Sequence, residues 1–217
     1  MAKTIWFLTG NRGKVDEAKH HFADLGYHVE QLQVKEGLIL EPQAEHLADV
    51  ARAKIEQARQ YTPSSDALVM VEDAGLFIDA LHGFPGVYSA NVMKTIGCDG
   101  VLRLLSHLED GEEGVRKQQR SASFQAVAAL WDGQRIIFGH GRCPGYIHTV
   151  TLGSQGFGFD PIFIPYDVGE IGEALNANQN GNTSSGGKTF GQLSMSEKNQ
   201  FSHRRRALDD LIQQLQH

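Results

Sequence analysis

Two adjacent acids at the end of an apolar run are the first residues of this chain that could do chemistry. Glu72 and Asp73 directly follow three apolar residues, and Gly75 stands two positions later. We expect the strand to end at the acids and the chain to turn there, with the glycine allowing close backbone approach. Hard divalent cations such as Mg²⁺ prefer carboxylate oxygens and keep several waters, one of which can act as the nucleophile. The pair therefore predicts metal-assisted hydrolysis, in which one carboxylate holds the metal and its neighbour accepts a proton. The alternative is an Asx turn at Asp73 with Glu72 in solvent.

A third acid, Glu41, follows the apolar residues of LILEPQ in the same way. It could supply a further carboxylate to the same metal, because oxygen ligands for one ion often come from separate segments. Taken alone it has the features of a surface acid, and both interpretations stay open.

The segment TGNRGK, residues 9–14, lies between an expected strand and an expected helix. Backbone N–H groups at the start of a helix form a natural site for an anion. Thr9 and Asn11 offer side-chain hydrogen bonds, the two glycines allow close approach, and Lys14 brings positive charge. A cation in the first turn of a helix opposes the helix dipole by about 0.3–1 kcal/mol, and a bound phosphate would remove that conflict. The segment fits a phosphate loop, although it is neither a Walker loop nor GxGxxG. In the alternative, Thr9 or Asn11 caps the helix and Lys14 is solvated.

Two later segments could complete a ligand site. The sequence SQGFGFDPIFIP, residues 154–165, alternates glycine with aromatic residues, which can form a flat slot for a base or, alternatively, a glycine-kinked strand with core phenylalanines. The sequence EKNQFSHRRRAL, residues 197–208, gathers Lys198, His203 and three arginines in an otherwise acidic chain. These cations could bind an anionic ligand or form a solvated cationic start to the last helix.

Apolar periodicity predicts the elements that would position these residues. Strands are expected at 4–9, 28–34 and 67–71, and helices from residue 14 and over 45–61, 99–108 and 205–215. Two long β-rich runs, 121–132 and 134–147, are joined by Asp132-Gly133, a strong hairpin signal. Strands alternating with helices, together with this hairpin, predict an α/β fold with a mixed sheet. Residues 176–187, NANQNGNTSSGG, have the composition of a mobile loop, either a lid or a solvated insertion.

The composition narrows the class of protein. The chain has 217 residues, a net charge of −6 and a pI near 5.9, so it fits one large domain, or one domain with two lobes, and it lacks the basic excess of nucleic-acid binders. Cys98 and Cys143 show no metal-ligand spacing and are expected to be thiols in a reducing compartment. The apolar run IWFL near the start is too short for a signal peptide or a membrane span, so a cytoplasmic location is expected.

Taken together, four segments resemble one family, the inosine triphosphate pyrophosphatases, also called Ham1 or RdgB-like non-canonical purine NTP pyrophosphatases. The family's motifs are T-x-N-x-x-K, then E/D-D-S/T-G-L leading to G-x-P-G-x-Y-S-A, then F-G-F/Y/W-D-P-x-F, and finally S-H-R. In this chain they stand, in the same order, as residues 9–14, 72–76 with 83–90, 157–163 and 202–204. The resemblance covers the chain from residue 3 to about residue 210.

The resemblance implies an elongated mixed β-sheet flanked by helices, in a single ITPase-like domain over residues 1–217 with two lobes and a nucleotide cleft between them. It implies a homodimer that hydrolyses ITP, dITP and XTP to the monophosphate and pyrophosphate with Mg²⁺, which keeps these nucleotides out of nucleic acid. The partner is then a small nucleoside triphosphate, and neither nucleic acid nor a membrane is expected to bind.

The resemblance also assigns roles by position. The metal ligands would be Glu41 and Asp73; Asp73 would accept the proton of the attacking water, and Glu72 is a possible additional acid. The substrate would contact Thr9, Gly10, Asn11, Arg12, Gly13, Lys14, Ala74, Phe157, Gly158, Phe159, Asp160, Lys198, His203 and Arg204.

Two departures from the family pattern stand out. Position 74 is alanine where the family commonly has serine or threonine, so a side-chain hydroxyl contact is lost and the backbone N–H is the remaining donor. The segment 176–187 looks longer than the family's usual connection, which bears on the substrate range.

Three other functions fit the sequence less well. A pyrophosphatase for other modified nucleotides, such as methylated pyrimidines, would typically open with S-x-S-P-R-R, which is absent. A nucleotide sensor without turnover would not need the water-activating acids. A nucleic-acid binder using the three arginines 204–206 fits the net charge of −6 least well.

Overall fold

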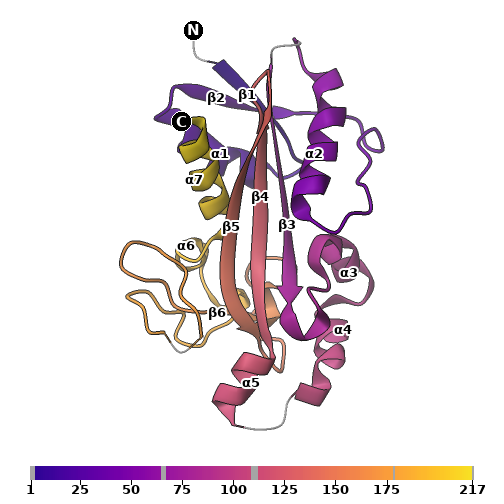
Figure 1. Ribbon diagram of the computed structural model, residues 1–217. Helices are drawn as coiled ribbons and strands as arrows, with labels where there is room; N and C mark the ends of the chain where they lie inside the picture. The colour runs from indigo at the N-terminus through magenta and orange to yellow at the C-terminus, as the bar shows by residue number, and fades with distance from the viewer. Residues whose placement is uncertain (1–2, 65–66, 109–111, 178, 217) are drawn as a thin grey trace. The chain divides into compact units, whose positions relative to one another are not determined.

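The computed structural model in Figure 1 describes residues 3–64, 67–108, 112–177 and 179–216. Within these ranges the strands form one six-stranded sheet with the order β2-β1-β3-β4-β5-β6. The strands are β1 (Lys3–Leu8), β2 (Tyr27–Leu32), β3 (Leu68–Ile78), β4 (Ser121–Trp131), β5 (Ile136–Ile147) and β6 (Phe163–Pro165). The helices are α1 (Arg12–Ala23), α2 (Leu47–Ala58), α3 (Ser89–Thr95), α4 (Gly97–Leu104), α5 (Glu113–Gln119), α6 (Met195–Asn199) and α7 (His203–Leu215).

The sheet is mixed and open. Strand β1 pairs in parallel with both β2 and β3, whereas β5 pairs antiparallel with β6. The order begins at β2 and ends at β6, so the sheet does not close into a barrel. The predicted α/β fold with a mixed sheet flanked by helices is confirmed.

The described residues form two compact units. Unit 1 is drawn from Met1–Ala74, Ala126–Gly141 and Arg204–His217, and unit 2 from Gly75–Gln125 and Arg142–His203. The long strands β3, β4 and β5 contribute residues to both units.

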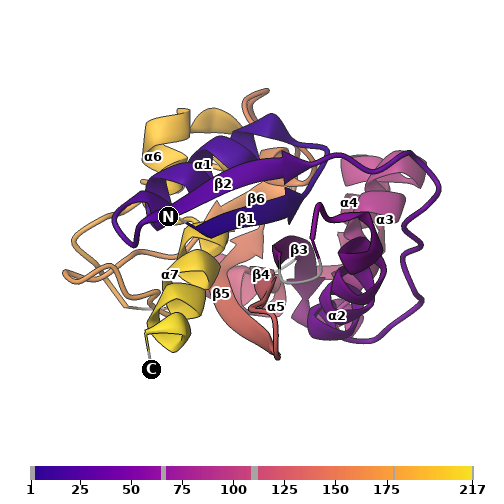
Figure 2. The same cartoon turned by 90° about the horizontal axis from the view of Figure 1, so that it is seen from above.

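Unit 1 has apolar residues on both faces of its strands. Ile5 and Phe7 of β1 belong to a buried cluster with residues of α1 and α7, while Trp6 and Leu8 pack in a second cluster that contains Ala58 of α2. Successive residues of a strand point to opposite faces, so these neighbours must reach different clusters. In the views of Figures 1 and 2, α7 and α2 accordingly lie on opposite sides of the strands of unit 1.

Unit 2 has its own core, built from Leu76 and Ile78 of β3, the ends of β4 and β5, helices α3 and α4, and the aromatic residues of the later loops. At one edge of this core the Arg120 side chain is only 1% exposed. Its guanidinium donates to the backbone carbonyls of Leu105, Ile147 and His148 at 2.7–2.8 Å. These bonds tie the chain after α4 to the end of β5.

The expectation of a turn at the two acids is wrong. Strand β3 runs from Leu68 through Glu72 and Asp73 to Ile78 without a break. The reason lies downstream, because Leu76 and Ile78 are fully buried and continue the strand into the core of unit 2. Gly75 does serve a close approach, since a Cβ there would lie 2.2 Å from the carbonyl oxygen of Gly86.

Other predicted boundaries shift by a few residues. Helix α1 begins at Arg12 rather than residue 14, β2 ends at Leu32, and α4 ends at Leu104 before a short 3-10 turn. Most of the segment 154–165 is a loop and turn rather than a kinked strand, because only its last three residues form β6.

The hairpin at Asp132-Gly133 is confirmed. The Asp132 N–H donates to the carbonyl of Arg135 at 3.1 Å, and Gly133 has a φ of +104°. Cys98 and Cys143 are thiols, as expected. Among the described residues, every helix is too short or too polar to cross a membrane.

Candidate active site

The segment after β1 forms a capped loop at the start of α1. The Asn11 side chain accepts a hydrogen bond from the Gly13 N–H at 2.9 Å, and the Asn11 N–H donates to Thr9 Oγ1 at 3.1 Å. The capping interpretation of Asn11 therefore holds. Residues Gly10–Gly13 are exposed, and the first turn of α1 contains no acid that would compete with a bound anion. The loop thus keeps the features of an anion site while it is capped.

Lys14 is not solvated, contrary to the alternative considered from the sequence. Its Nζ lies 3.1 Å from Glu72 Oε1, and the Arg204 Nε lies 2.9 Å from the same oxygen. The Glu72 side chain is only 2% exposed, so it does not point to solvent either. Both contacts are ion pairs without hydrogen-bond alignment. Burial and the nearby Glu72 raise the pKa of Glu17, against the lowering effect of Arg204 and Lys14.

Asp73 and Glu41 meet at a lysine that the sequence reasoning missed. The Nζ of Lys54 lies 2.5 Å from Asp73 Oδ1 and 2.5 Å from Glu41 Oε1, so the two carboxylate oxygens are at most twice that distance apart. The Lys54 and Asp73 side chains are each 14% exposed, and that of Glu41 is 65% exposed. The second oxygen of Asp73, Oδ2, is buried and has no hydrogen-bond partner in the described part of the chain.

The charges of this group shift one another's proton affinity. Burial raises the pKa of Asp73 above its ordinary value, Lys54 opposes that rise, and Glu41 adds to it. Burial lowers the pKa of Lys54, but its two acidic neighbours outweigh burial and raise it overall. Lys54 therefore stays charged and holds the two acids together.

The sequence did carry a signal for Lys54. It lies on α2 among the buried residues Leu47, Val50, Ala51, Ile55 and Ala58, at the spacing of the apolar stripe. A lysine on the buried face of a helix is rarely found without a partner, and the nearby acids supply it here.

These groups border a cavity of about 520 Å³ within unit 1. Its walls include Thr9 and Gly10 of the capped loop, the chain after β2, and the side chains of Glu41, Lys54 and Glu72. The start of the capped loop, the Glu41–Lys54 pair and Glu72 therefore adjoin one space.

In unit 2 the glycine-aromatic segment is a turn organised by Asp160. The Asp160 side chain is 3% exposed; its Oδ2 accepts from the Phe157 N–H at 2.7 Å and lies 2.5 Å from Lys198 Nζ. Gly156 has a φ of +75°, and a Cβ there would lie 2.1 Å from Asp160 Oδ2. Phe159 is buried in the core, whereas Phe157 is 53% exposed. Of the two aromatic residues predicted to receive a base, only Phe157 offers its ring to solvent.

Lys198 lies against that ring. Its Nζ is 4.7 Å from the centre of the Phe157 ring and 5.1 Å from that of Phe190. On the other side of the turn, the Cys98 thiol donates to the Gly158 carbonyl at 3.6 Å. Burial, followed by Asp99 and Asp160, raises the pKa of Cys98 to about 11, so this thiol stays protonated at neutral pH.

The remaining predicted residues have different surroundings. His203 is 7% exposed, and its ring stacks on Phe124 at 5.2 Å in unit 2. Arg204 belongs to unit 1, where it pairs with Glu72. Ala74 is half-buried beside the core of unit 1. The segment 176–187 is anchored at Thr183, which exchanges two backbone hydrogen bonds with Val168 at 2.9 and 3.1 Å.

Comparison with known proteins decides the family. A family model described as Ham1 family matches residues 5–214. This chain belongs to the Ham1 family. It is 43% identical over 202 residues to the dITP/XTP pyrophosphatase of Thermococcus kodakarensis, covering 93% of this chain and 91% of that protein. It is 38% identical to the protein of the same name from Pyrococcus horikoshii, covering 94% and 92%.

Solved Ham1 structures have the same fold. The Staphylococcus aureus Ham1 protein matches with a TM-score of 0.73 and 27% identity, covering 99% of this chain and 98% of that one. A HAM1 protein from Coxiella burnetii gives a TM-score of 0.73 at 25% identity, covering 100% and 99%. The resemblance identified from the four sequence segments is confirmed.

Proposed function

We propose that this Ham1-family chain hydrolyses the non-canonical purine nucleoside triphosphates ITP, dITP and XTP to the monophosphate and pyrophosphate. The observation that carries the proposal is that Glu41 and Lys54, to which Asp73 is paired, border the same cavity as the loop at Thr9 and Gly10. Relatives that match over more than nine-tenths of the chain are named dITP/XTP pyrophosphatases.

The triphosphate binds at the capped loop in this proposal. The exposed loop at residues 10–13 and the positive end of α1 attract the phosphate oxygens, and Lys14 supplies a full charge. Lys14 is held near the loop by Glu72, so a phosphate that approaches meets a cation already in position. Such preorganised charge stabilises negative charge that develops during reaction.

The residues of unit 1 fit a bound magnesium ion. Mg²⁺ is usually held by one or two carboxylates together with substrate phosphates, and Glu41 and Asp73 provide that number. The buried Oδ2 of Asp73 has no hydrogen-bond partner in the described chain, so it is available to coordinate a metal. The described residues contain no group of three or more His, Cys, Asp or Glu side chains placed to hold a metal without substrate. When bound, the metal would neutralise phosphate charge and make water a better nucleophile.

Asp73 is the proposed proton acceptor. Its raised pKa makes its carboxylate a stronger base than an exposed aspartate, and Lys54 opposes that rise by stabilising the ionised form. Glu72 is already paired with two cations, so it is less suited to take a proton and instead orients Lys14 and Arg204.

The base is read in unit 2 at the turn around Asp160, in the same proposal. Phe157 offers a face for stacking and Lys198 offers a donor for the 6-oxo group of hypoxanthine or xanthine. A 6-amino group would leave such a donor unmatched, at a cost of about 1–3 kcal/mol. GTP also has a 6-oxo group, so its rejection must arise at the 2-position. His203 and Arg204 are proposed to complete substrate binding.

The test is a panel of nucleoside triphosphates with Mg²⁺, reading out pyrophosphate against orthophosphate. We expect pyrophosphate from ITP, dITP and XTP and little from ATP or GTP. Orthophosphate as the product, or equal rates with ATP, would contradict the proposal. The homodimer stays a prediction from the family resemblance and the cytoplasmic location a prediction from the sequence. Light scattering of the purified chain tests the first.

A further inference from the structure

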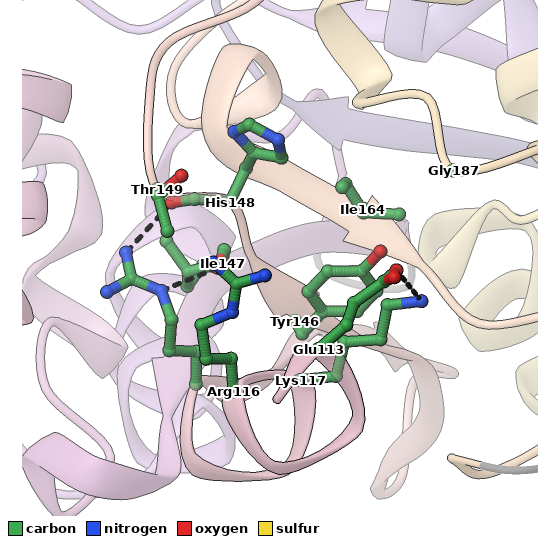
Figure 3. Close-up of a pocket in the computed structure, with 10 residues that line it drawn as sticks. Glu113, Arg116, Lys117, Tyr146, Ile147, His148, Thr149, Ile164 and Gly187 are labelled. Carbon is green, nitrogen blue, oxygen red and sulfur yellow. Dashed lines mark hydrogen bonds and ion pairs between the residues drawn. The ribbon is translucent and has the colours of Figure 1, made fainter. Parts of the chain in front are cut away.

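A separate cavity in unit 2 contains none of the residues assigned to the proposed reaction. It has a volume of about 230 Å³ and lies between α5 and the chain that follows β5 (Figure 3). Its lining residues are Glu113, Arg116, Lys117, Arg120, Tyr146, Ile147, His148, Thr149, Ile164 and Gly187. Three of these side chains are permanently cationic and one is acidic, in a chain whose net charge is −6.

The cations of this cavity are not equivalent. Lys117 pairs with Glu113 at 2.7 Å, and Arg120 is bound to backbone carbonyls. Arg116 forms no side-chain hydrogen bond or ion pair with any residue that the structure describes. Figure 3 shows its guanidinium pointing from α5 into the space between Tyr146 and His148. Arg116 is therefore the cation of this cavity that can bind an anionic ligand without giving up another contact.

A neighbouring cavity of about 350 Å³ continues the first one. Both are lined by Lys117, Tyr146, Ile164 and Gly187, and the rings of Tyr146 and Tyr166 stack at 5.8 Å along the wall of the second. The far side carries amide and hydroxyl side chains of the glycine-rich segment, namely Asn176, Gln179, Asn180, Ser184 and Ser185. The pair of cavities is thus cationic at one end, and the other end has neutral hydrogen-bonding groups together with the Asp167 carboxylate.

We propose that these two cavities form a second binding site, for a small organic phosphate monoester. The phosphate binds at Arg116, because a guanidinium matches phosphate oxygens with two parallel N–H donors. The hydroxyl-bearing remainder of the ligand lies along Tyr146 and hydrogen-bonds to the segment 176–187. The first cavity is smaller than the roughly 300 Å³ at which ligand pockets usually begin, and the two together exceed it. This site stands whether or not the proposed reaction is correct.

The experiment is an amide NMR titration of the ¹⁵N-labelled full chain without divalent metal. The probes are ribose 5-phosphate, inorganic phosphate and ribose, and the signals followed are those of Thr149 and Gly187, which line the cavity. We expect saturable shifts with ribose 5-phosphate, an affinity at least tenfold lower for inorganic phosphate, and no shift with ribose. Equal affinity for inorganic phosphate would mean that only an anion is bound, and this would overturn the proposal.

Variants assign the binding to Arg116. Arg116→Ala should raise the Kd at least tenfold, and Arg116→Lys should raise it less, since charge is kept while the paired donors are lost. The matched control Arg103→Ala removes an exposed arginine of α4 outside the cavity and should leave the Kd unchanged. Lys14→Ala should also leave it unchanged, which separates this site from the phosphate loop.

The proposal would also be overturned by the absence of a saturable shift, by equal weakening in Arg103→Ala, or by loss of the shifts in Lys14→Ala. The melting temperature of ligand-free Arg116→Ala should match that of the parent, because alanine is a good helix former and the Arg116 side chain makes no hydrogen bond or ion pair in the described chain. With ligand, the parent, Arg103→Ala and Lys14→Ala should gain melting temperature by mass action, and Arg116→Ala should gain less.

Discussion

Each unit of this molecule contains an aspartate paired with a lysine at 2.5 Å, and the two pairs differ in what surrounds them. In unit 2, Asp160 binds both Lys198 and the Phe157 N–H, and Lys198 packs over two aromatic rings. In unit 1, Asp73 shares Lys54 with a second acid and keeps a buried oxygen without a partner in the described chain. A satisfied pair fixes a turn, whereas a pair with an unfilled acceptor is ready to take a metal or a proton.

The largest effect is expected from a change that breaks the Asp73–Lys54 pair of unit 1. Asp73→Asn should lower kcat for ITP by about 10³-fold, within the range for loss of a general base, with KM little changed. Steady-state kinetics with pyrophosphate detection measures both constants. The control Asp99→Asn changes an exposed acid on α4 and should keep the parent's kcat. Unchanged turnover in Asp73→Asn would remove this residue from the mechanism.

The matching change in unit 2 should act on stability instead. Asp160→Asn weakens the bonds to Lys198 and to the Phe157 N–H in a side chain that is 3% exposed, and should lower the free energy of unfolding by about 1–3 kcal/mol. Asp73→Asn should lower it less, since it also removes the cost of burying a charge. Urea denaturation of both variants gives the comparison. The reverse order of the two losses would show that the pairs have been assigned the wrong roles.

The pH dependence of activity in Lys54→Met tests the role of the unit 1 pair. Lys54 lowers the pKa of Asp73, so Lys54→Met should raise that pKa further. The reaction needs ionised Asp73, and the acidic limb of the kcat/KM profile should therefore move to higher pH. Lys19→Met, an exposed lysine of α1, should leave the limb in place. A limb that stays fixed in Lys54→Met would separate Asp73 from the titration that controls activity.

The smallest effect is expected at the exposed ring of unit 2. Phe157→Leu should raise KM for ITP about 3- to 10-fold through lost stacking, of the order of 1 kcal/mol. Its free energy of unfolding should stay within about 0.5 kcal/mol of the parent, since the ring is 53% exposed. A KM equal to the parent's would leave base binding at this turn without support.

The mixed α/β fold and the hairpin at Asp132 could be predicted from the sequence, because they follow from local patterns of apolar and turn residues. The sequence did not predict that β3 continues past the acids, since the carbonyl of Gly86 that packs on Gly75 comes from a later segment. Helix α5 was not predicted, because it is short and polar and has no apolar stripe.

The candidate site was predicted in part. Glu41 and Asp73 were expected to meet, and they do so through Lys54, whose position on the buried face of α2 becomes informative only when its partners are known. The alternatives that placed Lys14 and Glu72 in solvent were wrong. The two side chains form an ion pair, and each compensates the charge that the other carries into a buried position.

The most direct test of the unit 1 assignment is hydrolysis of ITP in ¹⁸O-labelled water by the parent and by Asp73→Asn, with mass spectrometry of both products. The account predicts that the label enters the nucleoside monophosphate in the parent and that the variant releases neither product at a comparable rate. Label found in the pyrophosphate, or full labelling of the monophosphate by the variant at the parent's rate, would contradict it.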